Sequence, residues 1–106
     1  NQEEVFGPVA TIIPFKSEKE AIEMCNNTKY GLSASIFTQN ISKAHRVASK
    51  LDVGVIWINS WLVRDLRIPF GGMKSSGVGR EGGFGSLEFF TETKNVCVKI
   101  EKGRNK

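Results

Sequence analysis

Cysteine, histidine and long apolar runs are all scarce in this sequence. It has two cysteines, Cys25 and Cys97, and one histidine, His45, among 106 residues. Two distant cysteines do not form a disulfide framework, and a lone histidine makes a poor metal site. No apolar run approaches the roughly eighteen residues that span a bilayer. These scarcities argue against a secreted disulfide-rich domain, a metal centre and a membrane partner, and they favour a reduced, cytoplasmic setting.

Charge of one sign is also scarce, because 15 Lys and Arg residues face 11 Asp and Glu residues, for a formal net charge of +4. Residues 101 to 106 (EKGRNK) contain three basic residues and one acidic residue, so they supply +2 of that total. The remainder has no basic stripe, and we expect no nucleic-acid partner. The sequence opens on Asn1 without a basic and then apolar leader, so we expect a fragment or processed chain and no signal peptide here.

Strand and helix patterns alternate in the first part of the chain. Residues 9 to 15 (VATIIPF) are β-branched and apolar, which predicts a strand. Ser17 and Glu20 have the spacing of a capping box, which predicts a helix that ends near residues 26 to 28. Residues 32 to 38 (LSASIFT) then predict a second strand.

The pattern continues with a second helix and a third strand. Asn40 is a plausible N-cap for a helix with an apolar stripe up to residue 51. The apolar run at 53 to 58 predicts a central strand buried on both faces. Together these patterns predict an α/β fold, βαβαβ with parallel strands. Residues 86 to 90 predict a short helix, and the alternation over 93 to 100 predicts a half-buried or edge strand.

A glycine-rich stretch, residues 59 to 81, follows the third predicted strand and carries four of the eleven glycines. A long irregular segment inside a domain is uncommon unless it is functional, so we interpret it as a loop that lines a site. Residues 77 to 82 (GVGREG) spell a dinucleotide-binding fingerprint, but no predicted strand runs directly into them. We therefore do not interpret them as a Rossmann turn.

Two arginines in this stretch are candidate ligand-binding residues. Arg64 and Arg67 interrupt an otherwise apolar context, and a guanidinium matches a carboxylate bidentately. They either bind an anionic ligand or pair with Asp65 or solvent. Cys25 and Cys97 have no local base or cation to activate them, so we expect both to be small buried apolar residues rather than nucleophiles.

Several segments in collinear order resemble the C-terminal part of the NAD(P)-dependent aldehyde dehydrogenases. The resemblance covers roughly residues 1 to 100, and its main segments are 3 to 8 (EEVFGP), 30 to 34 (YGLSA), 54 to 59 (GVIWIN), 69 to 81 (PFGGMKSSGVGRE) and 90 to 96 (FTETKNV). Residues 61 to 67 (WLVRDLR) look like the branch that oxidises 2-aminomuconic or 2-hydroxymuconic semialdehyde. Those substrates carry a carboxylate remote from the aldehyde.

The resemblance implies two residues that contact a cofactor. Glu4 would accept hydrogen bonds from the nicotinamide ribose hydroxyls, and Phe6 would pack beside the nicotinamide ring. The cofactor would be NAD or NADP, because the segment that discriminates between them lies outside this sequence.

The resemblance also implies four residues on the substrate side. Arg64 would be the first choice for the substrate carboxylate and Arg67 the second. Phe70 would border the aldehyde, and Asn59 would lie at the strand end that leads into the pocket.

The implied architecture has three parts. Residues 1 to 90 would be the C-terminal part of the catalytic domain, 91 to 101 an oligomerisation strand, and 102 to 106 a flexible basic tail. The strand would join an intersubunit sheet in a homo-oligomer, dimeric or tetrameric, because an alternating edge strand suits strand addition.

The implied activity is oxidation of an aldehyde to the acid with NAD(P), through a cysteine thioester. The nucleophilic cysteine, the glutamate base and the cofactor domain would be encoded before Glu3, so this chain would hold no catalytic residue and be inactive alone. The alternative is a non-catalytic structural or assembly module that reuses the same fold.

Overall fold

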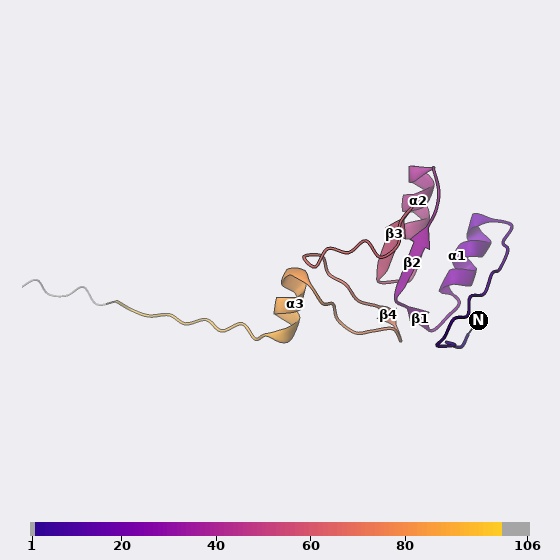
Figure 1. The fold of residues 1–106 in the computed structure, drawn as a ribbon. Coiled ribbons are helices and arrows are strands. Elements are labelled where there is room, and N and C mark those ends of the chain that lie inside the picture. The colour runs from indigo at the N-terminus through magenta and orange to yellow at the C-terminus, as the bar shows by residue number, and fades with distance from the viewer. Residues whose placement is uncertain (1, 101–106) are drawn as a thin grey trace, which may run out of the picture.

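The computed structural model describes residues 2 to 100 as an α/β structure, which confirms the predicted fold class (Figure 1). Its elements, in chain order, are α1 (Glu18–Asn26), β1 (Tyr30–Gly31), β2 (Ser33–Ile36), α2 (Ile41–Ala48), β3 (Val55–Ile58), β4 (Met73–Lys74) and α3 (Gly83–Phe90).

Helix α1 begins at the predicted capping residues. The Ser17 hydroxyl accepts a hydrogen bond from the Glu20 backbone N–H at 3.1 Å, and the Glu20 carboxylate accepts one from the Lys16 N–H at 2.7 Å. The first contact satisfies a donor that a helix start leaves unpaired, and the second binds the N–H of the residue before the N-cap instead of the Ser17 N–H that a capping box engages. Glu18 in the first turn also receives two hydrogen bonds from Arg46 of α2, at 2.8 and 2.7 Å. These bonds lower the pKa of the Glu18 carboxyl and tie the two helices together.

The centre of the fold is the unit β2–α2–β3. The strands β2 and β3 are parallel, in register from Ser33 opposite Val55 to Ile36 opposite Ile58, and α2 is the crossover between them. The Asn40 side chain caps α2 by accepting from the Lys43 N–H at 2.9 Å, as predicted. Ala44 of α2 and Trp57 of β3 form the buried core, at 0% and 8% exposure.

Three strand predictions were wrong in detail. Residues 9 to 15 are irregular and exposed, and residues 93 to 100 are extended but pair with no strand among residues 2 to 100. β3 pairs with β2 only in the described chain, so it is not central, and most of its residues are half-buried. A strand needs a neighbour for its backbone hydrogen bonds, and neither 9 to 15 nor 93 to 100 finds one within the described residues.

The glycine-rich stretch is held against the sheet by close backbone contacts. β4 pairs antiparallel with β1, and the backbones of Phe70 and Glu81 form a further antiparallel bridge. A Cβ on Gly54 would lie 1.7 Å from the Gly71 carbonyl oxygen, so glycine is required where the two segments touch. Residues 77 to 82 thus belong to an antiparallel return, which is not the strand–turn–helix of a dinucleotide fold.

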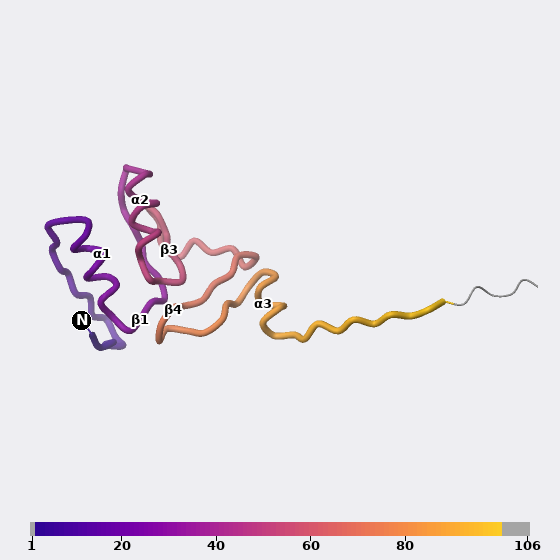
Figure 2. The backbone as a smooth tube through the Cα atoms, turned by 180° about the vertical axis from the view of Figure 1, so that it is seen from behind, coloured from indigo at the N-terminus to yellow at the C-terminus, as the bar shows by residue number. Residues whose placement is uncertain are grey.

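The described chain is open rather than compact. Its accessible surface is 9536 Å², against about 5,900 Å² for a compact protein of this mass. The radius of gyration is 22.0 Å, against about 13 Å for a compact chain of 100 residues. Residues 91 to 100 extend away from the other elements (Figures 1 and 2). None of the helices within residues 2 to 100 has the length and apolar character to cross a membrane.

Both cysteines are exposed free thiols, so the prediction that they are buried was wrong. Cys25 lies on the face of α1 toward β2, and Cys97 lies in the extended residues 91 to 100. Neither position is covered by another described element. The residues expected to form a basic tail, 102 to 106, and residue 101 of the expected oligomerisation strand lie outside the described part of the chain.

Candidate functional site

Three adjoining hollows line the side of the molecule on which the glycine-rich stretch lies. The Glu4 hollow, about 410 Å³, is lined by Glu3, Glu4, Cys25, Thr28, Tyr30, Gly31, Leu32, Ser33, Val53 and Ser76. The glycine hollow, about 330 Å³, is lined by Leu32, residues 70 to 72 and 76 to 81, and Phe89 and Phe90. The Arg64 hollow, about 180 Å³, is lined by residues 55 to 57, 63 to 65 and 68 to 70. Leu32 and Ser76 line the first two hollows and Phe70 lines the last two, so each hollow shares a wall with the next.

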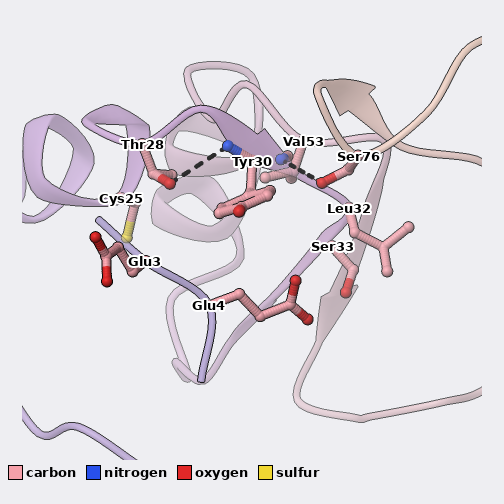
Figure 3. A pocket seen from close by; sticks show the side chains of 10 residues that line it. Glu3, Glu4, Cys25, Thr28, Tyr30, Leu32, Ser33, Val53 and Ser76 are labelled. Carbon is pink, nitrogen blue, oxygen red and sulfur yellow. Dashed lines mark hydrogen bonds between the residues drawn. The ribbon is translucent and has the colours of Figure 1, made fainter. Parts of the chain in front are cut away.

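The Glu4 hollow is lined by two neighbouring carboxylate side chains, Glu3 and Glu4, and by residues tied together by hydrogen bonds from backbone N–H groups (Figure 3). The Ser76 hydroxyl accepts from the Gly31 N–H at 2.9 Å, which joins the glycine-rich stretch to β1. The Thr28 hydroxyl accepts from the Tyr30 N–H at 3.3 Å on the opposite side. Glu4 comes from the N-terminal segment and makes no hydrogen bond or ion pair with another residue of the described chain. Its two carboxylate oxygens are therefore available to donors on a ligand.

Phe6 follows Glu4 by two residues and lines none of the three hollows. Its ring is 97% exposed. An aromatic ring with no partner in the described chain presents a flat apolar face to any group placed beside it.

Arg64 and Phe70 are brought into direct contact. The guanidinium carbon of Arg64 lies 4.4 Å from the centroid of the Phe70 ring, a cation–π arrangement. The same guanidinium forms an ion pair with Glu81 through Nη2. The Phe70 and Glu81 backbones exchange two hydrogen bonds, 2.7 and 2.8 Å long. The structure therefore joins one cation, one ring and one carboxylate at the junction of two hollows.

Arg67 behaves differently, although it lies only three residues further along. Its Nε donates to both oxygens of Asp65, at 2.9 and 3.1 Å, and its Nη2 also donates to this carboxylate. These hydrogen bonds lower the pKa of Asp65 and raise the pKa of Arg67. Pairing with Asp65 was the alternative to ligand binding, and the structure contains that pair.

Asn59 lies at the end of β3, as expected, but lines none of the three hollows. Its side-chain oxygen accepts from the Thr38 N–H at 2.8 Å, and its side-chain amide donates to the Thr38 carbonyl at 2.9 Å. Its φ of 52° is in the left-handed region, which asparagine tolerates better than most residues. In this chain Asn59 fastens the end of β3 to the segment that follows β2.

Glu81 is the residue of this surface that the sequence did not single out as a candidate. It lies eleven positions after Phe70, and no local spacing links it to Arg64. Only the backbone bridge between Phe70 and Glu81 brings the carboxylate to the guanidinium. Residues 2 to 100 contain no cluster of three or more His, Cys, Asp or Glu side chains that could hold a metal ion.

Comparison with known proteins identifies the family. The model of the aldehyde dehydrogenase family matches residues 1 to 96. The chain belongs to the aldehyde dehydrogenase family. The resemblance seen in the sequence is thereby confirmed.

The curated relatives of this aldehyde dehydrogenase chain include two kinds of muconic semialdehyde dehydrogenase. It is 59% identical over 98 residues to 2-hydroxymuconic semialdehyde dehydrogenase of Pseudomonas sp. (strain CF600), covering 92% of this chain and 20% of the relative. It is 57% identical over 97 residues to 2-aminomuconic semialdehyde dehydrogenase of Homo sapiens, with the same two coverages. The chain thus spans about a fifth of the length of these relatives.

Solved structures agree with this assignment. HpcC from Thermus thermophilus matches with a TM-score of 0.83 at 46% identity, covering 95% of this chain and 21% of that one. Betaine aldehyde dehydrogenase from Staphylococcus aureus in complex with NAD⁺ matches with a TM-score of 0.80 at 48% identity, covering 84% and 18%. The open arrangement of elements described above is therefore that of a segment of an aldehyde dehydrogenase.

Proposed function

We propose that this chain is the C-terminal part of an NAD(P)-dependent aldehyde dehydrogenase that oxidises a semialdehyde bearing a carboxylate. The observation that carries the proposal is the Arg64 guanidinium over the Phe70 ring, in a hollow that shares walls, through the glycine hollow, with the one that Glu4 lines. A cation next to an apolar ring suits a ligand with an anionic end and an unsaturated carbon chain.

The residues present fit a nicotinamide cofactor. Glu4 offers two acceptor oxygens without a partner in the described chain, which suits the paired hydroxyls of a ribose. Phe6 offers an exposed ring face of the kind that packs beside a flat heterocycle. When bound, the cofactor accepts the hydride that the aldehyde gives up. Support for NAD comes from the NAD⁺ complex of the Staphylococcus aureus relative, and NADP remains the second candidate.

Arg64 and Phe70 bind and orient the substrate in this proposal. Arg64 holds the remote carboxylate, and Phe70 forms an apolar wall beside the chain that leads to the aldehyde. Arg67 is a weaker candidate because Asp65 already occupies its guanidinium. Asn59 acts from outside the pocket by holding the end of β3 in place. The nucleophile and the base come from the remainder of the enzyme.

A non-catalytic structural or assembly module that reuses the same fold is the second candidate, and residues 91 to 100 suit association with another subunit under either candidate. Val96, Val98 and Ile100 occupy every second position and are exposed, and this segment pairs with no strand in the described chain. An extended segment of this kind suits addition to the sheet of another subunit. We therefore propose a homo-oligomer, and the cytoplasmic location inferred from the cysteine content stays a prediction.

A chimera tests the catalytic proposal. The 98 matching residues of the Pseudomonas sp. (strain CF600) enzyme are replaced by those of this chain, and steady-state kinetics are measured with 2-hydroxymuconic semialdehyde and with a simple aliphatic aldehyde. The chimera should oxidise both substrates. Arg64→Ala should raise KM for the carboxylated substrate by about 10- to 100-fold, the usual worth of a hydrogen-bonded charge pair, and leave the aliphatic aldehyde nearly unaffected.

Arg67→Ala is the matched control. It removes another arginine from the same loop, one whose Nε and Nη2 already donate to the Asp65 carboxylate. It should change KM for the carboxylated substrate much less than Arg64→Ala does. Equal losses on both substrates in Arg64→Ala would contradict a carboxylate contact. A well-folded chimera without activity would favour the assembly module.

A further inference from the structure

We propose that Glu81 is the positioning residue for Arg64: it holds the guanidinium against Phe70 so that the remaining N–H groups face an incoming carboxylate. The inference rests on the proposed role of Arg64. It assigns to Glu81 a part in selecting anionic substrates.

Backbone pairing places the side chains of Glu81 and Phe70 next to each other. They lie directly opposite each other in an antiparallel bridge with hydrogen bonds of 2.7 and 2.8 Å. Residues directly opposite in such a bridge project their side chains to the same face. Arg64, seventeen residues before Glu81, lies between these two side chains.

The guanidinium is restrained in two directions. The guanidinium carbon lies over the Phe70 ring, 4.4 Å from the ring centroid. Glu81 accepts from Nη2, at one edge of the plane. Together these two contacts restrict the motion of a long side chain that has several rotatable bonds. Because Arg64 is already restricted, less of its side-chain conformational entropy is lost when a substrate binds.

The restraint leaves donors available. An arginine has five N–H groups, and the contact with Glu81 engages Nη2 alone. Within residues 2 to 100, Nε and Nη1 of Arg64 donate to no protein group. Arg67 is the internal contrast, since its Nε and Nη2 both bind the Asp65 carboxylate. Two arginines of one loop thus differ in how many guanidinium nitrogens remain free to donate to a ligand.

The pair is partly solvated, with the side chains of Arg64 and Glu81 44% and 59% exposed. A pair this exposed adds little to stability, so its main effect is on the orientation of Arg64. The negative charge of Glu81 also opposes an anionic substrate. Orientation of Arg64 should strengthen binding of an anionic substrate, and repulsion by the Glu81 charge should weaken it. Substitutions at Glu81 distinguish the two effects.

The experiment compares Glu81→Ala, Glu81→Gln and Glu81→Asp in the chimera. Glu81→Ala frees Arg64 and should raise KM for the carboxylated semialdehyde by about three- to tenfold, the range expected when one side chain must be ordered on binding. Glu81→Gln keeps an acceptor at the same reach and should leave that KM unchanged or lower. Glu81→Asp keeps the charge but withdraws the carboxylate, and it should raise KM as Ala does. KM for the aliphatic aldehyde should not change in any of the three variants.

The double variant Arg64→Ala/Glu81→Ala should have the same KM for the carboxylated substrate as Arg64→Ala alone, because Glu81 acts through Arg64. Calorimetric binding of the carboxylated reaction product gives a readout that does not depend on turnover. If Glu81→Ala or Glu81→Asp lowers or preserves KM while Arg64→Ala raises it, Glu81 is only an opposing charge, and this inference is overturned while the proposed function stands. If Arg64→Ala has no selective effect, the proposed function itself fails.

Discussion

Arg64 and Arg67 show how much a partner decides at the scale of one residue. Both belong to one loop and carry the same guanidinium group. Arg67 donates to Asp65 through Nε and Nη2, whereas Arg64 donates to Glu81 through Nη2 alone and lies over the Phe70 ring. From the sequence, Arg64 is preferred to Arg67 as the ligand of the substrate carboxylate only because of its position relative to the Pro69–Phe70 pair. The partner of each was settled by the backbone path of residues 64 to 81.

Asn59 carries a prediction at the same scale. Asn59→Ala should lower the free energy of unfolding of the chimera by about 2 kcal/mol, because two hydrogen bonds to Thr38 are lost and alanine tolerates the positive φ poorly. Denaturant unfolding measures this change. Asn59→Gly is the matched control. Glycine adopts the positive φ without strain, so this variant measures the loss of the two side-chain hydrogen bonds alone.

The kinetics of the same variant distinguish the two roles of Asn59. If it fastens the strand end, Asn59→Ala should affect both substrates alike at a temperature where the protein is folded. A rise in KM for one substrate without loss of stability would instead support the substrate contact that the family resemblance implies.

At the scale of elements, the contact between the start of β3 and the glycine-rich stretch carries the site. Gly54 precedes β3 and lies so close to Gly71 that any side chain would overlap its carbonyl oxygen. This contact sets where Phe70 and Arg64 lie relative to the sheet. The hollows therefore depend on backbone packing between segments as well as on the side chains that line them.

Gly54→Ala should destabilise the chimera by more than about 2 kcal/mol, because the backbone of residues 71 and 72 must move to admit the new methyl group. Gly85→Ala is the matched control in α3, where no atom lies within 4 Å of the added Cβ. It should be neutral or stabilise by about 0.5–1 kcal/mol, since alanine favours a helix over glycine. Thermal and denaturant unfolding compare the two. A tolerated Gly54→Ala would show that the two segments do not pack closely in solution.

At the scale of the whole molecule, apolar surface dominates. Among residues 2 to 100, twenty-four large apolar side chains are exposed, and only Ala44 and Trp57 form a buried core. So small a core cannot offset the entropy of ordering a chain of this length. The remainder of an aldehyde dehydrogenase would cover this surface, in keeping with the fifth of the relatives' length that the chain spans.

The isolated 106-residue chain should therefore self-associate and form no NADH from NAD⁺ and an aldehyde. Light scattering after size-exclusion chromatography measures the first property, and absorbance of NADH measures the second. We expect association because of the exposed apolar side chains, and inactivity because we propose that the nucleophile lies in the remainder of the enzyme. A compact monomer with a radius of gyration near about 13 Å, or steady NADH formation, would contradict this prediction.

Local chemistry made part of the fold predictable. The capping residues Ser17 and Asn40 set the helix starts, and apolar periodicity located the parallel unit β2–α2–β3. These features depend on neighbours within a few residues, so the sequence alone contains them. The ordered series of segments likewise determined the family, because several matches in one order are far more specific than any one.

What only the tertiary structure decided depends on partners distant in sequence. Residues 9 to 15 and 93 to 100 have the composition of strands, but a strand forms only where another backbone meets it. Cys25 and Cys97 have apolar surroundings in sequence, yet both are exposed because no described element covers them. The pairing of Glu81 with Arg64 arises in the same way, since these residues lie seventeen positions apart and only the path of the backbone brings them together. The pairing of Asp65 with Arg67 is local, and the sequence already offered it as an alternative to ligand binding.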